Sequence, residues 1–186
     1  MIGVKNKIFA IEGEWNDNLR KKETIKSSLT LLEEVSNINH IYRKVNTVVG
    51  LVGYLKESKK MPYQEYDIIF LAFHGTRYDI EMSKNNYISI KDLADNCNGW
   101  FNEKHIHFSS CAVGLDPKRL EYFKEVTGAA SVSGYKKTID FFESSIFDMV
   151  LLQKLTEYSR MGSLDNYLKS KFKYLYNKLG FKMIYN

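Results

Sequence analysis

The sequence predicts an α/β fold, a three-layer α/β/α sandwich built around a mostly parallel sheet. Two features indicate this class: short apolar segments rich in β-branched and aromatic residues, and amphipathic segments that alternate with them along the chain. The clearest apolar segments are residues 67–73 and 105–108. Such segments are typical of central parallel strands covered on both faces, and ligands of these sheets lie beyond the carboxyl ends of the strands.

The first half of the chain predicts two strand–helix pairs. Strands are expected at 7–11 and 39–45, and helices at 24–36 and 47–59. Apolar residues recur at helical spacing in the first helix and are expected to face the sheet: Ile25, Leu29, Leu32 and Val35. Pro62 ends the second helix, because proline cannot continue a helix interior.

The second half continues the alternation after the strand at 67–73. A hairpin is expected from 77–82 and 87–90, over the carboxyl end of that strand. Further helices are expected at 91–96, 116–127, 140–158 and 163–179, and further strands at 105–109, 129–133 and 181–185. The inward face of the helix at 140–158 is expected to carry Phe142, Ile146, Met149, Val150, Leu152 and Leu155.

The composition fits one globular domain spanning residues 1–186. Hydrophobic residues make up 44% of the chain, which argues against disorder. The net charge of +5 and the pI of about 9.0 are too mild to indicate a nucleic-acid binder by themselves. The sequence has no recognisable signal peptide and no apolar segment of membrane-spanning length, so a cytoplasmic protein without a membrane partner is expected.

The cysteine, histidine and glycine patterns indicate no cofactor. His105 and His107 share a strand face, but no third ligand follows at metal-site spacing. No glycine-rich phosphate motif follows the first strand, which argues against nucleotide binding. We therefore expect no metal and no cofactor, and we expect Cys97, His40 and His107 to be structural.

Basic and aromatic residues are mixed in the segment 169–176, a combination found on surfaces that bind nucleic acid. Its apolar residues nevertheless recur at helical spacing and predict a core-facing side with lysines at the edge: Leu168, Phe172, Leu175 and Leu179. The packing interpretation is favoured, and no nucleic-acid partner is expected.

Two residues with catalytic chemistry follow the two central strands. His74-Gly75 comes directly after the strand at 67–73, and Cys111 follows the strand at 105–108 through Ser109-Ser110. If these strands are neighbours, the imidazole and the thiol lie at one rim of the sheet, where histidine can take the thiol proton and make the sulfur a nucleophile. The N–H groups of Gly75 and Cys111 form a candidate oxyanion hole.

This arrangement resembles the caspase-like cysteine peptidases. The shared pattern is a strand followed by His-Gly and then a strand followed by Cys-x-x-Gly, here His74-Gly75 and Cys111 to Gly114. The segment 126–144 also looks like the bacterial members after their nucleophile. The resemblance covers roughly residues 7–155 and implies a His74–Cys111 dyad that hydrolyses peptide bonds of a polypeptide substrate.

Two features depart from the family pattern. Ser109 stands two residues before the nucleophile, where caspases carry glutamine and metacaspases aspartate. The connection from Cys111 to the helix expected at 116 is too short for a caspase-type processing linker. Activation by cleavage is therefore not expected, and control by a regulatory protein partner or by a larger assembly is favoured instead.

By the same resemblance, the carboxyl end of the first strand lines the pocket for the residue before the cut. Glu12 and Glu14 lie there, and Ser109 and Asp140 complete the expected substrate-binding set. An anionic pocket favours cleavage after Arg or Lys, although the two glutamates could equally be a solvated strand end. The alternative to a peptidase is a non-catalytic domain of the same shape that binds a partner or a small ligand.

Overall fold

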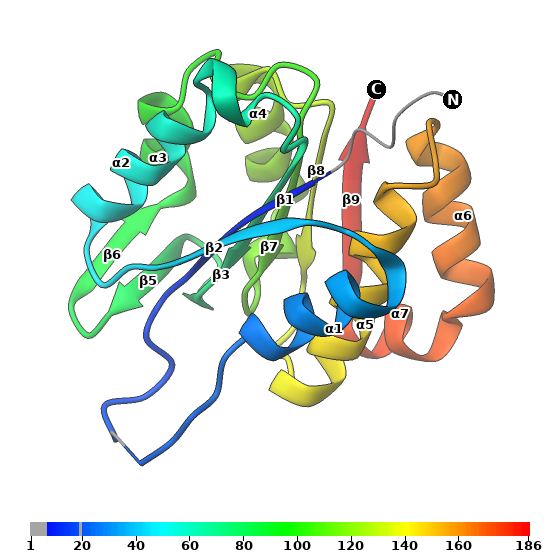
Figure 1. Ribbon diagram of the computed structural model, residues 1–186, viewed down its shortest axis with the longest axis horizontal. Coiled ribbons are helices and arrows are strands. Elements are labelled where there is room, and N and C mark those ends of the chain that lie inside the picture. Colours follow the sequence, from blue (N-terminus) through cyan, green and yellow to red (C-terminus); the bar gives the residue numbers. More distant parts are fainter. Residues whose placement is uncertain (1–6, 19) are drawn as a thin grey trace.

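The computed structural model, which describes residues 7–18 and 20–186, confirms the three-layer α/β/α sandwich (Figure 1). Its central sheet has six strands in the order β2-β1-β3-β7-β8-β9, and all neighbours are parallel except β8 and β9. The strands are β1 (Ile8–Glu12), β2 (His40–Lys44), β3 (Ile68–Ala72), β7 (His105–Ser109), β8 (Ser131–Tyr135) and β9 (Phe181–Tyr185).

Helices cover both faces of the sheet and enclose two apolar cores (Figure 1). One face carries α2 (Val48–Ser58), α3 (Ile90–Asn96) and α4 (Pro117–Thr127). The other carries α1 (Lys26–Ser36), α5 (Phe141–Leu155), α6 (Met161–Lys171) and α7 (Lys173–Leu179). The central strands β1 and β3 are buried along their whole length, because both of their faces lie under helices.

A second, small sheet lies beyond the carboxyl end of β3. It has the order β4-β5-β6, formed by β4 (His74–Gly75), β5 (Asp79–Ser83) and β6 (Asn86–Ser89), and all its strands are antiparallel. The expected hairpin is confirmed as β5 and β6. The sequence did not predict that His74-Gly75 would pair with that hairpin, and this pairing fixes the backbone that follows β3.

Side-chain capping sets the ends of the helices around the site. Asp116 caps α4 by accepting a hydrogen bond from the Lys118 N–H, and Pro117 occupies its first turn. Gly128 ends the same helix with a φ of 79°, a conformation that glycine adopts without strain. Short 3₁₀ turns occur at η1 (Met61–Tyr63) and η2 (Val113–Leu115), and the second begins two residues after Cys111.

The structure differs from the sequence prediction in three helices. In α5, which ends at Leu155, the expected Leu152 and Leu155 are buried. Phe142, which was also expected to face the core, is 73% exposed, and Asp148 is unexpectedly buried at 2% exposure. Val35 of α1 is also exposed. The last helix is interrupted at Phe172, which separates α6 from α7. Within the part of the chain that the structure describes, every helix is too short or too polar to cross a bilayer.

Candidate active site

The two central strands bring His74 and Cys111 to one pocket. β3 and β7 are hydrogen-bonded neighbours, with Ala72 opposite Ser109 in the register. His74 and Cys111 lie just beyond these strand ends, and both line a pocket of about 370 Å³. The two strands are therefore neighbours and their carboxyl ends lie at the same rim of the sheet, as the predicted site requires.

Cys111 lies on a tight turn that holds its sulfur at the pocket wall. The next residue, Ala112, has a φ of 57°, a left-handed conformation that costs a non-glycine residue about 1–2 kcal/mol. The Ala112 N–H donates to the Lys137 carbonyl at 3.0 Å, and the Ile139 N–H donates to the Cys111 Sγ at 3.4 Å. The loop after β8 therefore holds both the turn and the sulfur. Backbone strain of this kind is concentrated at functional sites.

Gly75 packs directly against the backbone of Cys111. A Cβ added at position 75 would lie 2.6 Å from the Cys111 carbonyl oxygen and 3.2 Å from its nitrogen. It would also lie 2.8 Å from the Cβ of Ser110. Position 75 therefore has no room for a side chain, which gives a steric reason for glycine after the histidine.

The imidazole of His74 is oriented by the loop that follows β1. Its Nε2 lies 2.8 Å from the carbonyl oxygen of Trp15, and the two rings meet edge to face with centroids 5.2 Å apart. A carbonyl can only accept a hydrogen bond, so Nε2 carries the proton in the neutral ring and Nδ1 keeps its lone pair. No local pattern in the sequence predicts this contact, because it joins residues far apart in the chain.

The position expected for Glu12 requires correction. Its side chain is fully buried, and the carboxylate accepts hydrogen bonds from the Trp15 indole, the Ile25 N–H, and the hydroxyls of Thr24 and Tyr42. Burial, together with the bond to Glu12, raises the pKa of Tyr42 to about 12. The Glu12 carboxylate therefore stabilises the loop that carries Trp15, and Glu12 does not line the pocket.

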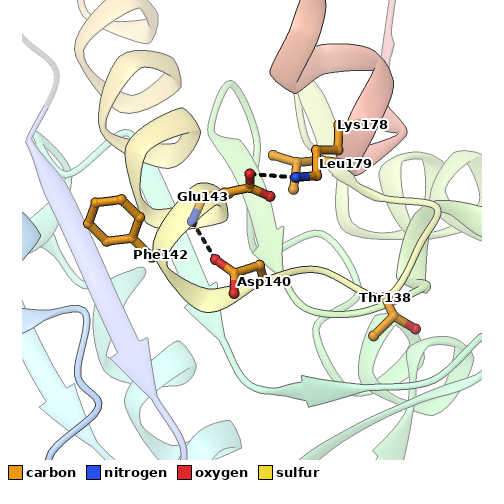
Figure 2. Close-up of a pocket in the computed structure, with 6 residues that line it drawn as sticks. All are labelled: Thr138, Asp140, Phe142, Glu143, Lys178 and Leu179. Carbon is orange, nitrogen blue, oxygen red and sulfur yellow. Dashed lines mark hydrogen bonds and ion pairs between the residues drawn. The ribbon is translucent and has the colours of Figure 1, made fainter.

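The other expected substrate-binding residues are distributed over three depressions. Ser109 lies in the pocket wall itself. Glu14 lies in an adjacent hollow that shares Trp15 and His74 with the pocket. Asp140 caps α5 through the Glu143 N–H and lies in a third hollow, beside the Glu143–Lys178 ion pair (Figure 2). Glu14 and Asp140 therefore flank the pocket, and their role in binding substrate stays a prediction.

Several pocket residues were missed by the sequence analysis. Asn16 and Glu23 come from the loop between β1 and α1, and Ser144 and Ser145 from the first turns of α5. The amide of Asn16 donates to the Glu23 carboxylate. Loop residues have no periodicity that would assign them to a site. Small polar residues in a helix ordinarily face solvent. The sequence therefore could not predict that these four residues meet at one pocket.

A buried polar network lies behind the pocket. The carboxylate of Asp148 on α5 accepts a hydrogen bond from Ser109 Oγ at 2.6 Å, another from His107 Nε2 at 2.7 Å, and a third from the hydroxyl of Tyr135. His107 also contacts the Ser133 hydroxyl at 2.9 Å. Burial and the neighbouring carboxylate raise the pKa of Tyr135 well above its usual range. Because Ser109 also lines the pocket, this network reaches the site.

The second cysteine lies in a different environment. Cys97 is fully buried in the core beside α3, and burial raises the pKa of its thiol to about 12. A thiol of this kind is inert at neutral pH, because the thiolate is the reactive form. Across residues 7–18 and 20–186 no three histidine, cysteine or acidic side chains are placed to hold a metal ion together.

Comparison with known families gives one match. A family model described as a family of unknown function, DUF6642, matches residues 5–185. The chain belongs to this family. No curated protein matches it. The matched region of this DUF6642 protein contains the sheet, both helical layers and the pocket that His74 and Cys111 line.

Proposed function

We propose that the protein is a cysteine endopeptidase in which Cys111 is the nucleophile and His74 is its base. The proposal rests on one observation: both residues line a single pocket at the adjacent carboxyl ends of β3 and β7. It agrees with the resemblance of the sequence to caspase-like peptidases. A buried thiol without a histidine at the same cavity would not support it.

The orientation of His74 suits the role of a base. Because Nε2–H is bound to the Trp15 carbonyl, Nδ1 is the nitrogen that can accept a proton. A base held by a third group is the usual arrangement around an activated nucleophile. In this proposal the Trp15 carbonyl also stabilises the imidazolium once the proton has moved.

The proposed reaction proceeds in two stages. His74 takes the thiol proton, the sulfur of Cys111 forms a bond to the peptide carbonyl carbon, and the carbonyl electron pair moves to the oxygen. His74 then protonates the leaving nitrogen as the C–N bond breaks, which leaves a thioester. Water, deprotonated by His74, attacks that thioester and breaks the C–S bond, and the proton returns to the sulfur.

The close approach of Gly75 to Cys111 supports an oxyanion site at this point of the chain. In the proposed mechanism the N–H groups of Gly75 and Cys111 face the oxygen that becomes negative. Backbone donors of this kind contribute about 10²–10³-fold to kcat when they are aimed at the developing charge. A side chain at position 75 would displace the Cys111 peptide and misplace that donor pair.

Digestion of a peptide library tests the proposal. The wild-type protein should cut internal peptide bonds, and both Cys111→Ala and His74→Ala should reduce the rate by about 10³-fold or more. Cys97→Ala is the matched control, because it removes the buried cysteine outside the pocket. A wild-type protein that cuts no peptide, or a Cys111→Ala variant with full activity, would favour the non-catalytic binding domain.

A further inference from the structure

A second cavity lies at the opposite rim of the sheet from His74 and Cys111. Its volume is about 680 Å³, within the range of sites that bind small molecules. Asp67 and Lys104, which both line it, directly precede β3 and β7, whose first residues are partners in the sheet register. Each of these strands spans five residues, roughly 16 Å, so this cavity is separate from the pocket at the carboxyl ends.

Lys104 is the buried residue of the cavity lining. It is only 6% exposed, whereas the other residues that the structure places in the lining are exposed or half-buried. Its Nζ donates to the carbonyl oxygen of Tyr66 at 2.7 Å. Its own N–H donates to the Phe101 carbonyl, and its carbonyl accepts from the Ala130 N–H, both at 2.9 Å. The main chain and the amine of Lys104 are therefore both held at the cavity wall.

This environment favours the neutral form of the amine. Burial lowers the pKa of the Lys104 ammonium, and the nearby Asp67 carboxylate opposes that shift only in part. In the neutral amine one N–H bonds to the Tyr66 carbonyl, and the nitrogen lone pair stays available to form a bond to carbon. A desolvated lysine of this kind is the nucleophile of Schiff-base chemistry.

The charges around the cavity disfavour an ionic ligand. Three carboxylates line it, those of Glu65, Asp67 and Glu103, together with the amino groups of Lys59 and Lys104. An anion would be repelled by the three carboxylates, and a cation would be repelled by the lysines. An uncharged molecule avoids both costs. The carboxylates can also carry protons to and from a reacting group.

An aromatic ring supplies an apolar part of the wall. Trp100 is half-buried and lines the cavity, and the Lys59 ammonium lies 5.0 Å from the centroid of its ring. This cation–π contact holds the indole in place. An indole packs well against a flat apolar body such as another aromatic ring.

We propose that Lys104 is a nucleophile that forms an imine with a small uncharged aldehyde bound in this cavity. The amine nitrogen forms a bond to the carbonyl carbon, and the carbonyl electron pair moves to the oxygen. The nitrogen gives up its two protons to that oxygen through the cavity carboxylates. The C–O bond then breaks, which releases water and forms the C=N bond. The site does not depend on the proposed peptidase function.

Reductive trapping tests the inference on the full chain. The protein is incubated with benzaldehyde and sodium cyanoborohydride at neutral pH, and the hydride converts an imine into a secondary amine that mass spectrometry assigns to one lysine. Lys104 should be modified at least about tenfold faster than Lys59 or Lys56. Lys59 is exposed at the same cavity, and Lys56 is exposed on α2 outside it. Modification of Lys104 no faster than that of these two lysines would overturn the inference.

A charged probe tests whether the cavity selects an uncharged ligand. 4-Carboxybenzaldehyde has the same reactive group and ring but carries a negative charge. Its rate at Lys104, divided by its rate at Lys56, should be at least about fivefold lower than the same ratio for benzaldehyde, because the cavity carboxylates repel it. Equal ratios for the two aldehydes would contradict the selection of an uncharged ligand.

Variants assign the binding to the cavity. Trp100→Leu should slow the modification of Lys104 by about fivefold or more, because it removes the ring that packs against benzaldehyde. Tyr174→Leu is the matched control, because it replaces an exposed aromatic residue on α7 outside the cavity. An unchanged rate in a folded Trp100→Leu protein, or equal slowing in both variants, would overturn the assignment. The comparison of Lys104 with Lys59 decides the outcome if Trp100→Leu fails to fold.

This proposal and the peptidase can fail separately. Lys104→Arg keeps a donor for the Tyr66 carbonyl and forms no imine, and it should leave peptide hydrolysis within about twofold of wild type. A protein that cuts peptides but shows no preferred modification of Lys104 would contradict the aldehyde site and leave the peptidase in place. A protein that is modified at Lys104 but cuts no peptide would contradict the peptidase and leave the aldehyde site in place.

Discussion

The α-carbon of Gly75 lies so close to the Cys111 peptide that a Cβ on it would approach the Cys111 carbonyl oxygen to 2.6 Å. The contact joins the short strand β4, which carries His74, to the turn that carries the nucleophile candidate. The atom it would displace is backbone, so the clash cannot be relieved by turning a flexible side chain. The relative placement of the two proposed catalytic residues therefore depends on the absence of a side chain at this position.

Gly75→Ala should lower both stability and activity. Overpacking against a backbone typically costs about 1–3 kcal/mol, and a shift of about 1 Å at a catalytic group can cost about 10²-fold in rate. Urea denaturation measures the first effect and peptide hydrolysis the second. Gly53→Ala in α2 is the control: a Cβ there meets nothing within 4 Å, so the free energy of unfolding should rise by roughly 0.5–1 kcal/mol.

Glu12→Gln should destabilise the fold although it removes only a charge. The carboxylate accepts from four donors, and a glutamine amide would turn an N–H₂ group toward some of them, which costs about 1–3 kcal/mol for buried groups left unpaired. Glu14→Gln, at an exposed site, should change stability by no more than about 0.5 kcal/mol. Equal urea midpoints for the two variants would contradict the structural role assigned to Glu12.

Alkaline pH should destabilise the protein through the half-buried phenol of Tyr42. Burial and the bond to Glu12 raise the pKa of Tyr42 to about 12, so the folded state holds this proton more tightly than the unfolded state does. The resulting stability is fully present below pH about 10 and is lost as the pH rises toward 12. Urea midpoints across this range measure the loss, which should be smaller in Tyr42→Phe. An unchanged loss in that variant would contradict the assignment.

The sequence predicted the elements whose signals are local. The apolar segments at 67–73 and 105–108 became β3 and β7, and Asp116-Pro117 opened α4 as its capping chemistry indicates. The meeting of His74 and Cys111 at one pocket also followed from local signals, because parallel neighbours with adjacent carboxyl ends are a general property of this fold class. These features needed no knowledge of long-range side-chain contacts.

The features that the sequence did not predict depend on partners far along the chain. Helix α5 is apolar on several sides, so its periodicity could not show that Asp148 is buried while Phe142 is exposed. The buried carboxylate is satisfied by donors from β7 and β8. Glu12 was expected at a strand end open to substrate, but the loop that follows it folds back and supplies its donors. Which donors bond to a buried carboxylate is decided only by the tertiary structure.

The rate of Cys111 alkylation at neutral pH, compared between the wild-type protein and His74→Ala, tests the central claim most directly. If His74 activates the thiol, iodoacetamide should label Cys111 at least about tenfold faster in the wild-type protein than in the variant, while Cys97 stays unlabelled in both because its buried thiol holds its proton. Equal rates of Cys111 labelling in the two folded proteins would contradict the claim that this histidine and this cysteine act together.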